Sequence, residues 1–225
     1  MQFAYAQKSV YAELPGRLYT QGKEMFLNNN YVGCINTLQE FKKQTKDVKL
    51  IPEVDYLLLS SYFYQGADGI GNKLKDYLEK YPETHHRNQL SFFIGTTHFV
   101  EKDWQKAVYW FNQADMDYLS SDEQEDYAYR TAYAGLQSGN RTDPKRLFGI
   151  LSRNSQKYAE PASYYLAYIN FQEGNYDQAL PIFRKLKNKG EYAEPASFFL
   201  VQGAYLQNDT EQTISEGKDY LSSYP

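Results

Sequence analysis

The sequence contains one hexapeptide twice, as Tyr158-Ala159-Glu160-Pro161-Ala162-Ser163 and again as Tyr192-Ala193-Glu194-Pro195-Ala196-Ser197. The copies begin 34 residues apart, and a similar pattern of aromatic, aliphatic and small residues follows each one. This spacing is the period of a repeat unit made of two helices and a turn. The hexapeptide therefore predicts an array of helix pairs. Its proline is expected in the first turn of a helix, preceded by a glutamate near the positive end of the helix dipole.

The composition is that of a folded chain with a tyrosine-rich surface or core. Of the 225 residues, 42 % are hydrophobic, which argues against wholesale disorder. The 23 tyrosines outnumber the 2 tryptophans, and tyrosine suits half-buried interfaces and grooves. The net charge is −4 and no basic stripe is visible, so nucleic acid is not expected as a partner. No apolar run of about 18 residues is present, so no transmembrane segment is expected.

The N-terminus carries a pattern that points to export. Ala4-Tyr5-Ala6 has the small-x-small form of a secretory cleavage site, although no charged and apolar leader precedes it. We interpret residues 1–6 as the remnant of a signal peptide, which predicts an exported protein, periplasmic or associated with the outer membrane. The alternative is a chance match, which leaves a cytoplasmic location open. The single cysteine, Cys34, excludes an internal disulfide and is expected to be a buried thiol.

Residues 7–225 are predicted to form six helix-turn-helix units, because prolines stand at helix starts and glycines or asparagines at turns. Each first helix has one small or aliphatic residue at an equivalent place, here called its seat. The seats are Gly22, Leu59, Gly95, Ala132, Ala167 and Val201. The units are expected at 15–46, 52–83, 84–119, 122–158, 159–191 and 193–225. The sequence ends at a unit boundary without a polar capping helix, so we expect the N-terminal part of a longer chain, or self-association through uncapped repeat ends.

The fifth unit resembles a tetratricopeptide repeat in Ala162-Ser163-Tyr164-Tyr165-Leu166-Ala167, then Gly174-Asn175-Tyr176-Asp177-Gln178-Ala179-Leu180, then Phe183. The third unit resembles it through Gly95, the run Asp103-Trp104-Gln105-Lys106-Ala107-Val108 and Phe111. The resemblance is weak in the second helices of units two and four. Second helices that end in Tyr81-Pro82 and Tyr224-Pro225 are more loosely similar to the repeats of bacterial periplasmic tol-pal proteins and outer-membrane assembly lipoproteins.

The resemblance implies an all-α fold, a right-handed superhelical α-solenoid of about six helix-turn-helix repeats, in which first helices line the concave side. The sequence places aromatic residues at two equivalent positions of these helices, seven residues apart. We predict a partner-binding groove lined by these rings, although packing between adjacent units would account for them equally well. The candidate groove residues are Tyr56, Phe63, Phe92, Phe99, Tyr129, Tyr164, Tyr168, Phe171, Phe198 and Tyr205.

Motifs that could carry chemistry have simpler explanations. Residues 66–73 contain the glycines of a phosphate loop. However, the lysine does not directly follow the last glycine, and no serine or threonine comes after it. His85 and His86, if on a helix, would point about 100° apart and would not form a metal pair, and His98 is expected to be a packing residue. The acidic stretch 122–126 is explained by capping of a helix. No catalytic residue, metal ligand or cofactor is predicted.

The sequence therefore predicts a non-enzymatic scaffold that binds a protein or peptide, in the bacterial cell envelope. The alternative is a sensory or docking region of a larger signalling or enzymatic protein, with the catalytic domain beyond residue 225.

Overall fold

The computed structural model describes residues 16–140 and 142–225, and these residues form helices and turns without any strand. The chain divides into two compact units. Unit 1 comprises the residues up to Lys102 together with Tyr109–Tyr118, and unit 2 comprises Asp103–Val108 with Leu119–Pro225. The suspected cleavage pattern at Ala4-Tyr5-Ala6 lies outside the described residues. None of the described helices is long and apolar enough to cross a membrane.

Unit 1 begins with helical residues 16–27. Four further helices and two short 3-10 helices follow; they are α2 (Tyr31–Gln44), η1 (Val48–Leu50), α3 (Ile51–Tyr64), α4 (Ile70–Lys80), α5 (Arg87–Val100) and η2 (Met116–Tyr118). The boundary between the units falls within α6 (Trp104–Phe111). From α2 to α5, each helix contacts the next one in the chain.

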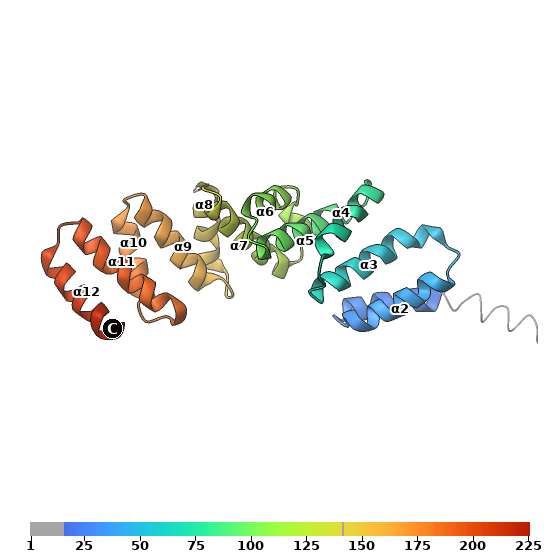
Figure 1. Cartoon of the computed structure of the whole chain (residues 1–225), viewed down its shortest axis with the longest axis horizontal. Helices are drawn as coiled ribbons and strands as arrows, with labels where there is room; N and C mark the ends of the chain where they lie inside the picture. The colour runs from blue at the N-terminus through green and yellow to red at the C-terminus, as the bar shows by residue number, and fades with distance from the viewer. Residues whose placement is uncertain (1–15, 141) are drawn as a thin grey trace, which may run out of the picture. The chain divides into compact units, whose positions relative to one another are not determined.

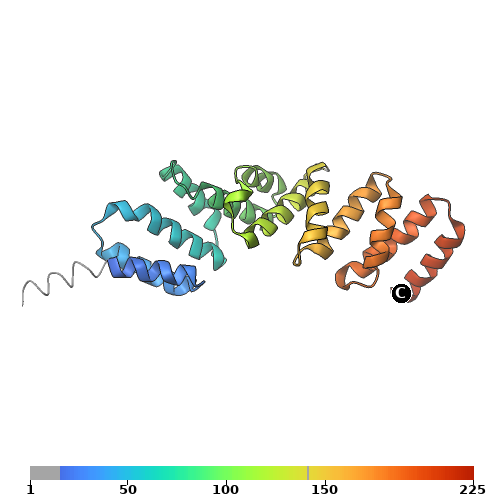
Figure 2. The same cartoon turned by 180° about the vertical axis from the view of Figure 1, so that it is seen from behind.

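Unit 2 continues the same succession with α7 (Ser121–Gln137), α8 (Thr142–Asn154), α9 (Ala159–Gln172), α10 (Tyr176–Leu186), η3 (Gly190–Tyr192), α11 (Ala193–Leu206) and α12 (Thr210–Ser223). Figures 1 and 2 show each of these helices beside its neighbour in the chain. The prediction of an all-α chain built from successive helix pairs is thus confirmed.

The turn inside each helix pair contains a residue with a left-handed backbone seven positions after the seat of its pair, so the backbone repeats with the spacing that the sequence alignment assigned. The turn of the second pair has a further such residue, Gly69. A left-handed turn ends the first helix and reverses the chain, which favours glycine or asparagine. The six residues are Asn29, Gly66, Lys102, Gly139, Gly174 and Asn208.

The seats provide close contact in some pairs and not in others. A Cβ atom on Gly95 would lie 2.5 Å from the ring of Phe111, so only glycine fits there without movement. Ala132 and Ala167 are fully buried. Val201 is only half-buried, and the close approach two residues later, at Gly203, is to Leu180 of α10 in the preceding pair. The seat is therefore a place of close packing in some pairs only.

The repeated hexapeptide begins the first helix of the fifth and sixth pairs. Tyr158 directly precedes α9, Pro161 lies in the first turn as expected, and Ala162 is fully buried. The Ser163 hydroxyl donates a hydrogen bond to the Ala159 carbonyl at 2.6 Å. Tyr192, Pro195, Ala196 and Ser197 repeat these positions at the start of α11. The repeated sequence thus encodes a repeated helix start.

The acidic stretch 122–126 has two roles. At the start of α7, the Glu123 carboxylate accepts a hydrogen bond from the Ser120 backbone N–H at 3.1 Å, which is the expected helix capping. Further along, Glu125 accepts a hydrogen bond from the Ser155 hydroxyl at 2.6 Å. Asp126 reaches the same segment before α9, so these carboxylates also tie the fourth pair to the fifth.

Asp126 is the centre of a charged cluster. Its carboxylate accepts hydrogen bonds from Lys157 at 2.5 Å, Tyr158 at 2.8 Å and Arg130 at 3.2 Å. Burial by itself would raise the pKa of Asp126, but the hydrogen bonds from Lys157 and Tyr158 and the charges of Arg130 and Lys157 together lower it. The ionised form is therefore the one that the fold stabilises.

Replacing Gly95 with alanine should destabilise the protein, because the added methyl group meets the rigid, fully buried ring of Phe111. We expect the free energy of unfolding to fall by about 1–3 kcal/mol in denaturant titrations followed by circular dichroism. The control is Gly217→Ala in α12, where no atom lies within 4 Å of the new methyl group. This change should raise stability by about 0.5–1 kcal/mol. Equal effects of the two variants would contradict the close contact.

Replacing Asp126 with asparagine should destabilise the protein near neutral pH by about 1–3 kcal/mol, since a charged hydrogen-bond acceptor is lost. The lowered pKa means that the carboxylate stabilises the fold above the ordinary aspartate value of about 3.9, and that this contribution disappears as the pH falls through the lower folded-state pKa. The melting temperatures of wild type and variant should therefore converge below about pH 4. Asp122→Asn, an exposed carboxylate at the start of the same helix, should show no such convergence.

Candidate functional site

The aromatic residues predicted to line a groove differ widely in exposure. Tyr56, Phe92 and Phe171 are buried, each with no more than 6 % of its surface exposed. Phe198 and Tyr205, both in α11, are 44 % and 71 % exposed. The other five are half-buried; they are Phe63, Phe99, Tyr129, Tyr164 and Tyr168. Of the ten predicted groove residues, only Phe198 and Tyr205 in α11 are therefore exposed.

Three rings of the first set are engaged by the residue that precedes the next first helix; they are Tyr56, Tyr129 and Tyr164. In unit 1, the His86 ring stacks on Tyr56, with centroids 3.3 Å apart and planes 3° apart. In unit 2, Tyr158 stacks on Tyr129 at 4.4 Å and 12°. Tyr192 contacts Tyr164 in the same way, at 5.0 Å with a larger tilt. Packing between helix pairs, the alternative explanation of the aromatic pattern, thus describes these three rings. We call this contact the start-ring stack.

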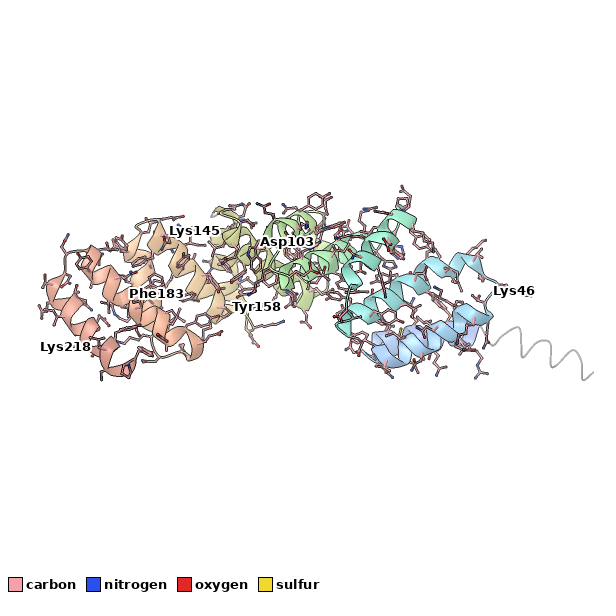
Figure 3. All side chains as sticks on the ribbon, viewed as in Figure 1. Lys46, Asp103, Lys145, Tyr158, Phe183 and Lys218 are labelled. Carbon is pink, nitrogen blue, oxygen red and sulfur yellow. The ribbon has the colours of Figure 1, made fainter. Side chains whose placement is uncertain are left out.

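The second set of rings also packs within the units. Phe63 stacks on Phe93 of the next first helix, with centroids 4.0 Å apart. Phe171 lies 4.9 Å from the ring of Phe199 and also contacts Phe183 in α10, which Figure 3 labels among the side chains of unit 2. Tyr168 meets Phe199 edge-on at 5.8 Å. The rings of successive first helices therefore join neighbouring pairs.

Buried phenols form part of this packing in unit 2. Burial is the main cause that raises the pKa of Tyr129 to about 12, with smaller contributions from the nearby Tyr133 and Tyr158. Burial also raises the pKa of Tyr165, where the phenols of Tyr129 and Tyr133 add to the effect. The raised pKa values thus reflect how far these phenols are removed from solvent.

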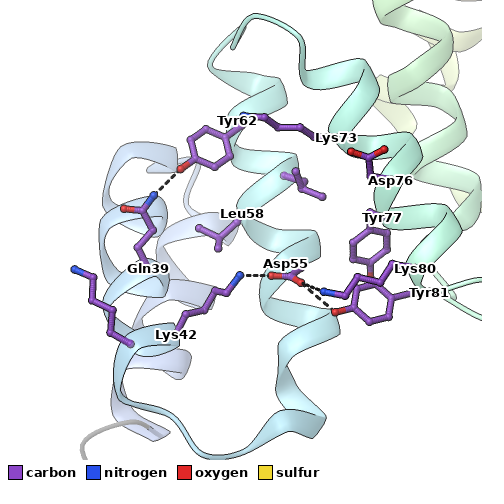
Figure 4. A pocket seen from close by; sticks show the side chains of 12 residues that line it. Gln39, Lys42, Asp55, Leu58, Tyr62, Lys73, Asp76, Tyr77, Lys80 and Tyr81 are labelled. Atoms are coloured by element: carbon purple, nitrogen blue, oxygen red, sulfur yellow. Dashed lines mark hydrogen bonds and ion pairs between the residues drawn. The ribbon is translucent and has the colours of Figure 1, made fainter.

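Unit 1 contains a groove of about 550 Å³ between α2, α3 and α4. Its apolar floor is made by Leu58 and Leu59 of α3, and Tyr62, Tyr77 and Tyr81 add aromatic surface. Lysines from α2 and α4 surround this floor, as Figure 4 shows for Lys42, Lys73 and Lys80. A cleft with an apolar base and a few polar groups is the usual form of a binding site.

A single carboxylate organises one end of this groove. Asp55 pairs with Lys42 at 2.6 Å and with Lys80 at 3.5 Å, and it accepts a hydrogen bond from the Tyr81 hydroxyl at 3.1 Å. Lys73 lies at the other end, 5.8 Å from the centroid of the Tyr62 ring. The contacts of Asp55 hold α2, α3 and α4 in a fixed arrangement.

Sequence reasoning missed this groove because it followed a different face of α3. Tyr56 and Phe63 were chosen for their repeated positions, whereas Asp55, Leu58 and Tyr62 line the groove. The spacing of these three residues is typical of one helix face. The lysines before and after α3 could have indicated the site, but their convergence depends on how three helices pack.

The histidines also differ from the expectation. His85 and His86 do not lie on a helix but in the turn before α5. The argument that excluded them as a metal pair therefore does not apply, and their ring nitrogens lie within 4.8 Å of each other and of the Glu53 carboxylate. His98 is buried between Lys75, at 3.0 Å, and Glu101, at 3.1 Å, as a packing residue with polar partners.

Replacing a buried aromatic residue should lower the stability of the protein much more than replacing an exposed one. Phe171→Ala should lower the free energy of unfolding by about 3–5 kcal/mol, because it removes a buried ring that contacts Phe183 and Phe199. Tyr205→Ala, in the equivalent position of the next unit, should change it by about 0.5 kcal/mol or less. Thermal and denaturant unfolding measure both values. A negligible effect of Phe171→Ala would instead favour a free groove surface.

No protein-family model and no curated protein matches the sequence. Solved structures do match its fold. A structure of PilF from Pseudomonas aeruginosa superposes with a TM-score of 0.57 at 14 % identity, covering 96 % of this chain and 94 % of its own. A mutant of MamA gives 0.60 at 16 % identity, with 78 % of this chain and 97 % of its own covered.

A tetratricopeptide repeat protein from Parabacteroides merdae gives a TM-score of 0.55 at 13 % identity, covering 93 % of this chain and 80 % of its own. Identities this low establish the fold and not the function. The looser resemblance to tol-pal and assembly-lipoprotein repeats remains a prediction. The chain has the helix-pair fold of tetratricopeptide repeat proteins.

Proposed function

We propose that the protein is a non-enzymatic scaffold and that the groove between α2, α3 and α4 binds a segment of a partner protein. The observation that carries this proposal is a groove of about 550 Å³ over the buried Leu58 and the half-buried Leu59, with lysines around it. Helix-pair repeats bury their own core by stacking and leave extended surfaces for partners. The proposed site moves the predicted interaction from the aromatic rings of first helices to a groove formed mainly between two second helices.

The charges around the groove suggest the chemistry of the partner segment. Asp55 is already engaged by Lys42, Lys80 and Tyr81. Lys43 makes only an exposed pair with Glu40, and Lys73 forms no ion pair among the described residues. A segment with apolar side chains for the floor and acidic side chains for Lys43 and Lys73 would complement this arrangement.

The exposed residues Phe198 and Tyr205 are a second proposed contact surface, in unit 2. They are the part of the predicted aromatic groove that internal packing leaves open.

We also propose a location in the cell envelope, for which Ala4-Tyr5-Ala6 is the support. The alternative role, as the docking region of a larger signalling or enzymatic protein, would use the same groove.

A photoreactive amino acid in α4 can identify the partner segment. Placed at Asp76, which lines the groove, it should cross-link one protein in the native cells. Placed at Glu79, an exposed residue of the same helix that does not line the groove, it should not cross-link that protein. Peptide mapping of the adduct then gives a segment that can be synthesised.

Reversing two groove charges should weaken binding of that segment. We expect Lys43→Glu with Lys73→Glu to raise the dissociation constant about tenfold in fluorescence anisotropy, since the two lysines together contribute up to about 2 kcal/mol and about 1.4 kcal/mol is tenfold. Lys46→Glu with Lys49→Glu changes the net charge equally, but neither residue lines the groove. Equal losses in the two double variants would mean that general charge, and not the groove, determines binding.

A further inference from the structure

A half-buried cluster in unit 1 combines one carboxylate with two imidazoles. Glu53, in the first turn of α3, lies 2.7 Å from Nε2 of His86. The ring of His85 is 3.8 Å from that of His86, and one ligand atom from each of the three residues lies within 4.8 Å of the others. We call these three residues the Glu53 cluster. None of them lines the groove.

The surroundings hold this cluster in place. The His86 ring stacks on Tyr56, and its backbone N–H lies 3.3 Å from the Thr84 hydroxyl. The hydroxyl of the buried Tyr77 donates to the Pro52 carbonyl at 3.0 Å and lies 3.3 Å from the Thr84 hydroxyl. Tyr77 therefore joins the residue before Glu53 to the residue before His85. Two of the three side chains are thus positioned before any ligand arrives, which favours binding.

Unit 2 contains a counterpart of the Glu53 cluster, centred on Asp126, and the two differ in the side chains next to the carboxylate. Glu53 and Asp126 each lie three residues before the tyrosine of a start-ring stack. In unit 2, Lys157 and Tyr158 take the positions that His85 and His86 have in unit 1, and both bind Asp126. The lysine ammonium supplies a cation next to the carboxylate. In unit 1, histidines occupy both positions, so the side chains beside Glu53 are electron-pair donors and not a fixed cation.

We propose that Glu53, His85 and His86 bind one divalent transition-metal ion of the zinc type. Two imidazole nitrogens and a carboxylate oxygen are a ligand set for zinc, with a water molecule as the fourth ligand. In a tetrahedral site with bonds of about 2.0–2.1 Å, ligand atoms are about 3.3 Å apart. The separations in the cluster bracket this value, and the exposed His85 can rotate to close the site. Calcium and magnesium require more oxygen ligands than the cluster offers.

One charged group competes with the metal ion. The exposed Lys23 lies close enough to Glu53 to affect its ionisation. It is flexible and can withdraw into solvent when a dication binds. Lys23→Gln should therefore tighten metal binding.

The experiment uses the full chain, produced without a histidine tag and treated with chelator. Titration with Co²⁺ should give the intense visible absorption of tetrahedral cobalt, saturating at one ion per chain, and Zn²⁺ should displace it while Mg²⁺ should not. His85→Ala and Glu53→Gln should each weaken Co²⁺ binding by at least about 100-fold, because loss of outer-shell partners alone costs 10–100-fold. Glu83→Gln, an exposed carboxylate near His85, should leave binding unchanged.

A variant that copies the unit 2 arrangement separates metal binding from folding. His85→Lys with His86→Tyr recreates the surroundings of Asp126, so it should fold with a melting temperature near that of the wild type but fail to bind Co²⁺. Zn²⁺ should raise the melting temperature of the wild type only. The proposal is overturned if the wild type shows no saturable binding, or if His85→Ala or the double variant binds Co²⁺ as the wild type does.

Discussion

The start-ring stack is the contact that joins successive helix pairs at three places, before α5, α9 and α11. A ring at the residue before a first helix lies on the aromatic residue of the preceding first helix, as with His86 on Tyr56 and Tyr158 on Tyr129. Large aromatic side chains bury extensive apolar surface and prefer defined ring geometries. A ring that must reach back to the previous helix pair also sets where the next helix begins. The stack therefore couples helix start and inter-pair packing in a single contact.

This coupling limits where a partner can bind. Rings that join successive first helices are not available to a ligand unless the pairs separate. Phe63, for example, already stacks on Phe93, and Phe171 already contacts Phe199. An accessible site is then expected where neighbouring helices leave a groove between them. In unit 1 that place is the floor of Leu58 and Leu59 between α2 and α4.

The periodic features of the fold could be predicted from the sequence because they are local. A turn with a left-handed backbone favours glycine or asparagine, so Gly174 and Asn208 mark their helix pairs directly. The hexapeptide indicated a helix start for the same reason. The role of an aromatic side chain is not local, since the same ring suits a groove and a core. Phe171 and Tyr205 occupy equivalent positions 34 residues apart, yet one is buried against Phe199 and the other is exposed.

The histidines illustrate a second limit of prediction from the sequence. Placing His85 and His86 on a helix would separate their rings, whereas the turn before α5 brings them together. The stack requires only a flat ring at this position, and imidazole satisfies that requirement as well as phenol does. The carboxylate three residues before the stacked tyrosine needs only a hydrogen-bond donor, which Tyr158 supplies to Asp126 and His86 to Glu53. Either ring thus satisfies the structural constraint at this position, and histidine places imidazole nitrogens beside Glu53 where unit 2 has a lysine beside Asp126.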